Sequence, residues 1–126
     1  MNPETQVYLN GKIVPSSEAH IAIYDASVVL GATLTDMERT FGHQLFRLDE
    51  HLDRFFRSCK YARIVPTISK GQTKKIVEEL VHHNAQFIES TQELGCIQFI
   101  SPGEFKVYAG SAGNADDMEP TFCIHT

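Results

Sequence analysis

Two consecutive amphipathic helix patterns in the middle of the chain constrain its fold most strongly. The first follows Asp49, a residue type that caps helices, and its apolar positions recur at helical spacing: Leu52, Phe55, Phe56, Cys59 and Ala62. Pro66 closes this region, because a proline disfavours helical geometry in the residue before it. The second pattern opens on Ser69 and Gln72, which match a capping box, and its apolar face contains Ile76, Val77, Leu80 and Val81 and extends toward Phe87. We therefore predict two successive helices.

Short β segments lie on both sides of this helical centre. The Asn10-Gly11 pair predicts a tight hairpin between strands at 7–9 and 12–14, and Gly42-His43 predicts a second hairpin between strands at 33–41 and 44–46. A short alternating stretch includes Ile21 and Ile23, while residues 28–32 read as a turn or buried loop. Further strands are expected at 96–100, 105–108 and 121–124. The pattern indicates an α+β fold with a mostly antiparallel sheet and two helices packed on one face.

Composition narrows the class of protein. The 126 residues fit a single domain spanning 1–126, and 42% hydrophobic content is typical of a globular chain. A net charge of −5 argues against a nucleic-acid or anionic-membrane partner. The first residues lack the basic and apolar regions of a signal peptide, and no apolar run approaches the roughly 20 residues of a membrane span, so we expect neither feature. Its three cysteines have no metal spacing and read as inert core thiols, so we expect a cytoplasmic protein.

The first predicted helix carries the strongest candidate for anion binding. One polar stripe on it consists of His51, Arg54 and Ser58. The Arg54 guanidinium can grip a phosphate or carboxylate in a bidentate way. The spacing alone favours another reading, in which two acid–base pairs four residues apart, Glu50–Arg54 and Asp53–Arg57, decorate a solvated helix face.

A second candidate is Arg39, in the strand predicted at 33–41. Strand alternation places it on one face with Thr33, Thr35 and Met37. An arginine beside threonines can bind an anion, but pairing with an acid of a neighbouring strand is the more common arrangement. Glycine-rich phosphate loops and the common hydrolase and zinc motifs are missing from the sequence.

Three stretches in the right order resemble the class IV (fold-type IV) pyridoxal-phosphate aminotransferases. The first is YLNGKIVP at 8–15 with the approach at 19–25; the second is DASVVLGATLTDMER at 25–39, which resembles the family's D-x-G-x-x-x-G-x-x-x-x-E-x-x-R block. The third, FRLDEHLDRFFRS at 46–58, resembles F-R-L-x-x-H-L-x-R-L-x-x-S almost position for position. A weaker resemblance, at 99–103, is to the segment that leads to the family's interface loop. The chain is similar to the family's N-terminal small domain, which is an α+β unit.

The resemblance assigns roles to individual residues. Arg54 matches the arginine that contacts the cofactor phosphate, and Arg39 matches an arginine near the substrate pocket. His51 and Ser58 also match the motif, and we expect them to help position the helix. Several positions depart from the family: Leu30 stands where a tyrosine is frequent and Thr35 where a phenylalanine is common. Ser27 and Thr33 stand where glycines are frequent, and Asp36 stands for a glutamate. The resemblance therefore implies a substrate pocket of altered shape.

The resemblance also implies what lies outside the chain. In the family, the lysine that binds pyridoxal phosphate covalently belongs to a C-terminal large domain, and no lysine here matches it. We therefore expect no catalytic residue in this chain, no activity from it alone and no cofactor bound by it alone. The complete enzyme would be a homodimer acting on an amino acid or amine and a 2-oxo acid. The alternatives are a stand-alone binding or dimerisation module and the small domain of an aminodeoxychorismate lyase-like enzyme.

Overall fold

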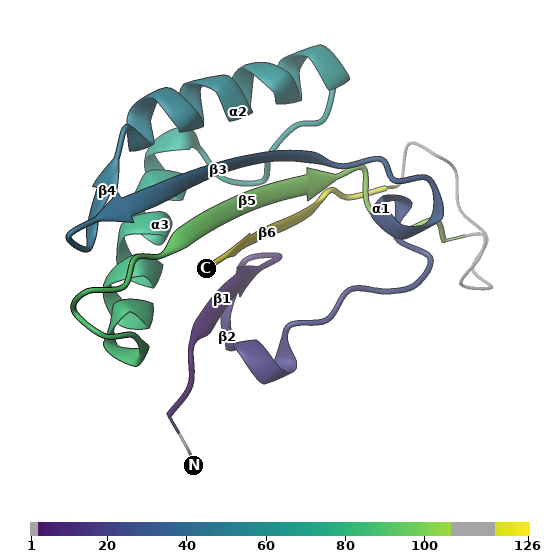
Figure 1. The fold of residues 1–126 in the computed structure, drawn as a ribbon. Helices are drawn as coiled ribbons and strands as arrows, with labels where there is room; N and C mark the ends of the chain where they lie inside the picture. Colours follow the sequence, from purple (N-terminus) through teal and green to yellow (C-terminus); the bar gives the residue numbers. More distant parts are fainter. Residues whose placement is uncertain (1–2, 107–117) are drawn as a thin grey trace.

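The computed structural model describes residues 3–106 and 118–126, in which a six-stranded sheet carries two helices on one face (Figure 1). The strands are β1 (Gln6–Leu9), β2 (Lys12–Pro15), β3 (Leu34–Phe41), β4 (Gln44–Phe46), β5 (Gly95–Ser101) and β6 (Thr121–His125). The helices are α1 (Ala26–Val29), α2 (Leu48–Ala62) and α3 (Lys70–Asn84), with 3₁₀ turns η1 (Ser16–Glu18) and η2 (Ala85–Phe87). The strand order is β2-β1-β6-β5-β3-β4, and all neighbours are antiparallel. The predicted α+β class is confirmed.

Both predicted hairpins form, and their turns have the expected backbone. Asn10 and Gly11 have φ of 49° and 90°, and Gly42 and His43 have φ of 57° and 62°. Two successive positive φ angles are typical of type I′ turns, whose twist matches that of the flanking strands. The second hairpin is held from outside, because the Glu93 carboxylate accepts hydrogen bonds from the backbone N–H groups of Gly42 (2.6 Å) and His43 (3.0 Å).

The two long helices start differently. The side chains of Ser69 and Gln72 form the predicted capping box of α3. The prediction that Asp49 caps α2 is wrong: the N-cap is Arg47, whose backbone lies in the left-handed region at φ 54°. Asp49 instead lies within the first turn, where its negative charge interacts favourably with the helix dipole. Its Oδ1 accepts a hydrogen bond from Lys74 Nζ at 2.9 Å.

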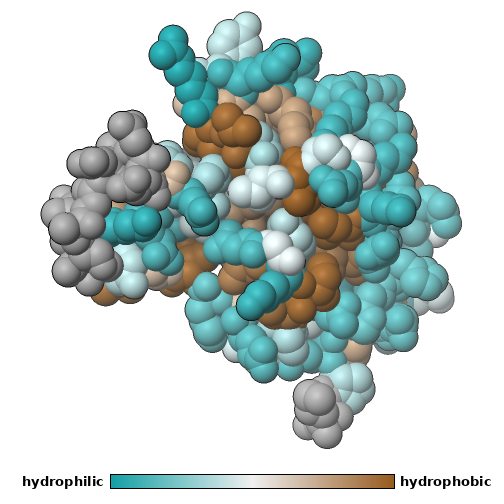
Figure 2. Space-filling view, turned by 180° about the vertical axis from the view of Figure 1, so that it is seen from behind, coloured by the Kyte–Doolittle hydropathy of each residue, from teal (hydrophilic) through white to brown (hydrophobic). Residues whose placement is uncertain are grey.

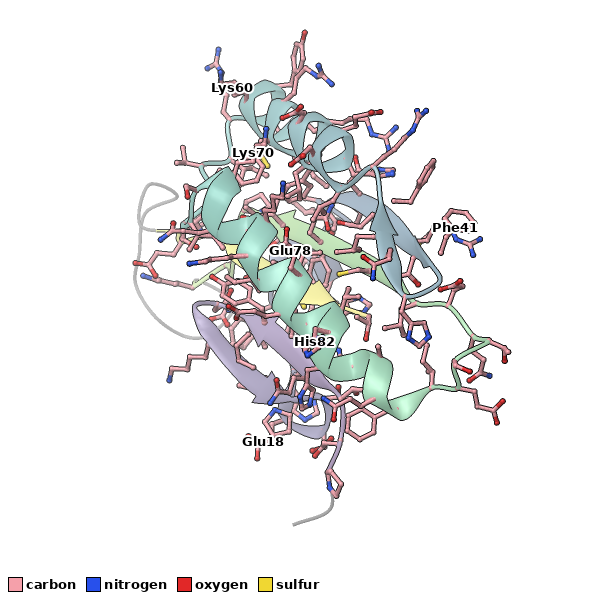
Figure 3. All side chains as sticks on the ribbon, turned by 90° about the vertical axis from the view of Figure 1, so that its left-hand side faces the viewer. Glu18, Phe41, Lys60, Lys70, Glu78 and His82 are labelled. Carbon is pink, nitrogen blue, oxygen red and sulfur yellow. The ribbon has the colours of Figure 1, made fainter. Side chains whose placement is uncertain are left out.

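The core lies between the helices and the sheet, and Figure 3 shows α3 crossing the front of the strands. Its buried members are Tyr8, Leu48, Leu52, Phe55, Cys59, Val77, Leu80, Val81, Cys96, Ile100, Phe122 and Ile124. The Phe122 ring makes T-shaped contacts with two other rings, Phe55 at 5.7 Å and Tyr8 at 5.8 Å between centroids. All three cysteines are buried, which raises the pKa of each thiol, as expected for inert core residues.

Several local predictions differ from the structure. The turn or loop predicted at 28–32 is confirmed for 30–32, but residues 28–29 belong to the short helix α1, which the Asp25 side chain caps through Ser27 N–H at 2.9 Å. Phe87 lies in η2 beyond α3 and is exposed, and the stretch with Ile21 and Ile23 is not a strand. The strand expected at 105–108 is not formed by its first two residues, and 107–108 fall outside the described range.

The face of the sheet turned away from the helices carries apolar side chains that no described element covers fully. Strand register places Met37, Ile97 and Phe99 on this open face, together with Phe41 of β3 and Phe46 of β4. Met37, Phe41 and Phe46 are each about half exposed. Seen from behind, the molecule shows hydrophobic patches bordered by hydrophilic side chains (Figure 2).

Both long helices have 15 residues, and no helix in the described part of the chain is long and apolar enough to cross a bilayer.

Candidate functional site

The Arg54 guanidinium is held by a carboxylate on the neighbouring strand. Alternation along β3 turns Asp36 toward α2, where its side chain is almost fully buried. Asp36 Oδ2 accepts from Arg54 Nε at 2.6 Å, and Oδ1 accepts from Arg54 Nη2 at 2.8 Å. This is the two-pronged geometry in which arginine binds carboxylates most strongly. The arginine is therefore oriented by the fold before any ligand arrives.

His51 completes the arrangement from one helical turn earlier. Its Nδ1 lies 2.9 Å from Asp36 Oδ1, and because an ionised carboxylate only accepts hydrogen bonds, Nδ1 carries the proton. Burial by itself raises the pKa of Asp36, but hydrogen bonds from Arg54 and His51 outweigh it and hold the pKa below its ordinary value. Asp36 is thus a permanent anion at neutral pH, and the same contact raises the pKa of Arg54.

The outer edge of Arg54 remains accessible. Its side chain is 62% exposed, and its Nη1 has no hydrogen-bond partner among the described residues. Strand β4 pairs only with Arg39, Thr40 and Phe41 of β3, so the part of β3 that contains Asp36 borders no strand on that side. The guanidinium therefore stands at an open edge of the sheet with donors free for an anion.

The helix-face ion pairs expected from spacing do not form. Glu50 contacts Arg47 at 3.4 Å rather than Arg54, and Asp53 pairs with Lys70 of α3 rather than Arg57. The reason is tertiary, because the buried Asp36 carboxylate requires a cation and Arg54 is the arginine of α2 that reaches it. The interpretation that Arg54 belongs to a solvated helix face is therefore wrong for the side of its guanidinium that binds Asp36.

Arg39 and Thr35 lie on the opposite face of the sheet from Asp36. Arg39 packs its guanidinium carbon 4.0 Å from the Phe41 ring centroid and donates from Nε to the Thr40 carbonyl at 3.1 Å. It makes no ion pair within residues 3–106 and 118–126, so the expected acidic partner on a neighbouring strand is not found there. Thr35 is exposed and lies opposite Phe99.

Leu30 lies at the end of α1 and is 68% exposed. The position of this turn depends on Asp25, a residue to which the sequence reasoning assigned no role. Asp25 is buried and accepts hydrogen bonds from the hydroxyls of Ser101 and Thr121 in addition to Ser27. The signal available in the sequence was an aspartate two residues before a serine, a common N-cap pattern.

Of the residues singled out in the sequence, His51 and Arg54 therefore meet at Asp36 on the edge of β3, whereas Thr35, Arg39 and Leu30 lie outside this cluster. No group of three or more His, Cys, Asp or Glu side chains in this part of the chain could hold a metal ion.

Comparison with known proteins assigns the chain to a family. The model of the amino-transferase class IV family matches residues 33–124, which include β3, the Asp36–His51–Arg54 cluster and both long helices. The chain belongs to the class IV aminotransferases. A D-alanine aminotransferase from Staphylococcus aureus (strain N315) is 30% identical over 93 residues, which cover 73% of this chain and 30% of that protein.

Solved structures agree on the fold. The branched-chain amino acid aminotransferase of Escherichia coli superposes with a TM-score of 0.79 at 15% identity, over 98% of this chain and 39% of that one. The branched-chain aminotransferase of the archaeon Thermoproteus uzoniensis, solved with norvaline, gives a TM-score of 0.77 at 19% identity, over 97% of this chain and 40% of that one. The chain thus spans 27–30% of the curated relatives' length and 39–40% of these solved chains.

Proposed function

We propose that this chain is the cofactor-phosphate-binding and substrate-pocket portion of a pyridoxal-phosphate-dependent aminotransferase. The single observation that carries the proposal is the Arg54 guanidinium, held on its inner edge by Asp36 and exposed on its outer edge. A guanidinium oriented in this way binds a phosphate without paying to order its own side chain.

The residues present fit a phosphate group. Arg54 contributes charge-assisted donors, and Asp36, which is itself bound by His51, keeps the arginine in place. When bound, pyridoxal phosphate supplies the carbonyl that carries the amino group and the ring that withdraws electrons. The chain's own part in the reaction is to hold the phosphate end. The amino acid or amine and the 2-oxo acid are the substrates of the family.

The pocket residues of this proposal are Leu30, Thr35 and Arg39. They occupy the open face of the sheet and the turn after α1, where apolar side chains remain uncovered. An uncovered apolar face of this kind supports packing of the remaining part of a complete enzyme against it. Thr35 is smaller than the phenylalanine frequent in the family, so we expect a preference for bulkier or more polar substrate side chains.

The test uses the complete enzyme that contains this chain. Arg54→Ala is expected to weaken pyridoxal-phosphate binding about 10- to 100-fold, because hydrogen bonds to charged groups contribute roughly 1.5 to 3 kcal/mol. Binding is measured by absorbance titration of the apoenzyme, with inorganic phosphate as a competitor. The matched control is Arg57→Ala, an exposed arginine one turn along α2 with no ion pair among the described residues. Unchanged cofactor affinity in Arg54→Ala would refute the phosphate role.

The open apolar face also favours a second candidate, a stand-alone dimerisation module. In that case two copies would cover Met37, Phe41 and Phe46 of each other. Sedimentation of the 126-residue chain tests this module: a stable dimer that Met37→Lys dissociates would support it, and a monomer would contradict it. An aminodeoxychorismate lyase-like reaction would be recognised in the complete enzyme by its products, an eliminated acid rather than a transferred amino group.

A further inference from the structure

A basic-rimmed apolar cavity lies at the far end of α2. It is a hollow of about 670 Å³, open to the solvent, between the last turns of α2, the connecting segment 63–69 and the start of α3. Its apolar lining is formed by Phe56, Cys59, Ile64, Val65 and Pro66. Val65 is 78% exposed, whereas Cys59 is buried, so the lining runs from the surface down to the core. A volume of this size falls within the range of roughly 300 to 1,000 Å³ in which proteins bind small molecules.

Four cations and one carboxylate surround this cavity: Arg57, Lys60, Arg63, Lys70 and Asp53. Asp53 is paired with Lys70. The other three cations make no ion pair in the part of the chain that the structure describes. Figure 3 shows Lys60 and Lys70 at the same end of the molecule, where α2 finishes and α3 begins. The rim is therefore strongly positive in a chain whose net charge is −5.

Helix electrostatics account for only part of this charge. Cations favour a helix C-terminus, which explains Lys60 in the last turn of α2 and Arg63 at its C-cap. Lys70, however, is the first residue of α3, where the helix dipole disfavours a positive charge, and the first turn of α3 contains no acid. Arg57 lies before the last turn of α2. The ion pair with Asp53 accounts for Lys70, but neither the helix dipole nor an ion pair within the described residues accounts for Arg57 beside this apolar cavity.

We propose that this cavity binds a small carboxylate with an apolar tail. The tail lies on Phe56, Ile64 and Val65, and the carboxylate meets the guanidinium groups of Arg57 and Arg63, whose forked donors match it. Arg63 presents its side chain from a fixed backbone, because its N–H donates to the Lys60 carbonyl at 3.2 Å with φ at 57°. The proposal is independent of the proposed function, since neither Arg54 nor Leu30, Thr35 or Arg39 lines the cavity.

The ligand test is calorimetric titration of the full chain with sodium octanoate below its micelle concentration. Two controls separate the parts of the ligand: octanol keeps the tail without the charge, and acetate keeps the charge without the tail. We expect saturable one-to-one binding of octanoate, with both controls at least tenfold weaker and affinity falling as salt is added. Absence of saturable octanoate binding, or equal binding of octanol, would overturn the proposal.

Substitutions in the rim and in the apolar lining test where the ligand binds. Lys60→Glu is expected to weaken octanoate binding at least tenfold, and Val65→Ser, which removes exposed apolar lining, to weaken it severalfold. The matched control is Lys12→Glu, which makes the same charge change on the exposed surface of β2 and should keep affinity within twofold. Equal losses in Lys60→Glu and Lys12→Glu would mean a long-range charge effect and sink the assignment. Amide chemical-shift changes confined to residues 56–70 would support it, and changes confined to the open sheet face would contradict it.

Discussion

At the scale of single residues, burial decides which charged side chains pair. Asp36 and Glu38 are neighbours on the helix-facing side of β3, and both are almost completely buried. Asp36 accepts hydrogen bonds from Arg54 and His51, so its negative charge is stabilised. Glu38 has no hydrogen-bond partner for either carboxylate oxygen in the described residues. Burial raises the pKa of Glu38 to about 8, and the negative charge of the neighbouring Asp36 acts in the same direction.

This contrast predicts a pH-dependent stability. Because the pKa of Glu38 is about 8 in the folded state against 4.5 ordinarily, its unfavourable contribution is absent below pH 4.5 and grows as pH rises toward 8. We expect Glu38→Gln to match the native protein at pH 4.5 and to exceed its unfolding free energy at pH 8.5 by roughly 3 to 5 kcal/mol. Urea denaturation followed by circular dichroism measures this difference. The exposed Glu79→Gln serves as control, and equal pH profiles for native protein and Glu38→Gln would disprove the assignment.

At the scale of elements, local capping chemistry explains one helix start and fails for the other. The Ser69–Gln72 box needs only residues three apart, so the sequence reveals it. The start of α2 is set instead by the β4–α2 corner, where Arg47 adopts a left-handed backbone without a side-chain cap. A non-glycine residue in that region costs energy that the surrounding packing must offset.

The capping box makes a prediction for α3. Ser69→Ala removes the acceptor for the Gln72 N–H and should lower the unfolding free energy by about 1 kcal/mol. Thermal or urea denaturation of the chain measures the loss. Ser90→Ala, at an exposed position between elements, is the control and should change stability by less than about 0.5 kcal/mol. A similar effect for the two substitutions would show that the cap contributes nothing specific.

At the scale of the whole molecule, Asp25 joins parts of the chain that are far apart in sequence. It caps α1 and accepts from hydroxyls at the end of β5 and the start of β6, at Ser101 and Thr121. Burial alone would raise the pKa of Asp25, but these hydrogen bonds outweigh it and the pKa is lowered. The turn that carries Leu30 is therefore fastened to the middle of the sheet.

Removing this carboxylate should affect the entire fold. Asp25→Ala leaves two buried hydroxyls and a backbone N–H without an acceptor, so we expect a loss of roughly 2 to 4 kcal/mol of unfolding free energy. Chemical denaturation gives the value. Asp53→Ala, which removes an exposed ion pair with Lys70, should cost at most about 1 kcal/mol. Comparable losses for Asp25→Ala and Asp53→Ala would contradict the anchoring role.

The sequence by itself determined the two helices, both hairpins, the alternation of β3, the Ser69 cap and the family motif around Arg54. These features depend on periodicity and on residues close in the chain, so a local reading recovers them. Only the tertiary structure decided that Arg54 binds Asp36 rather than Glu50, that Asp25 anchors α1, and that Arg39 lies across the sheet from Arg54. Arg54 and Asp25 find these partners 18 to 96 residues away in the chain, and which side chains meet depends on what the sheet buries.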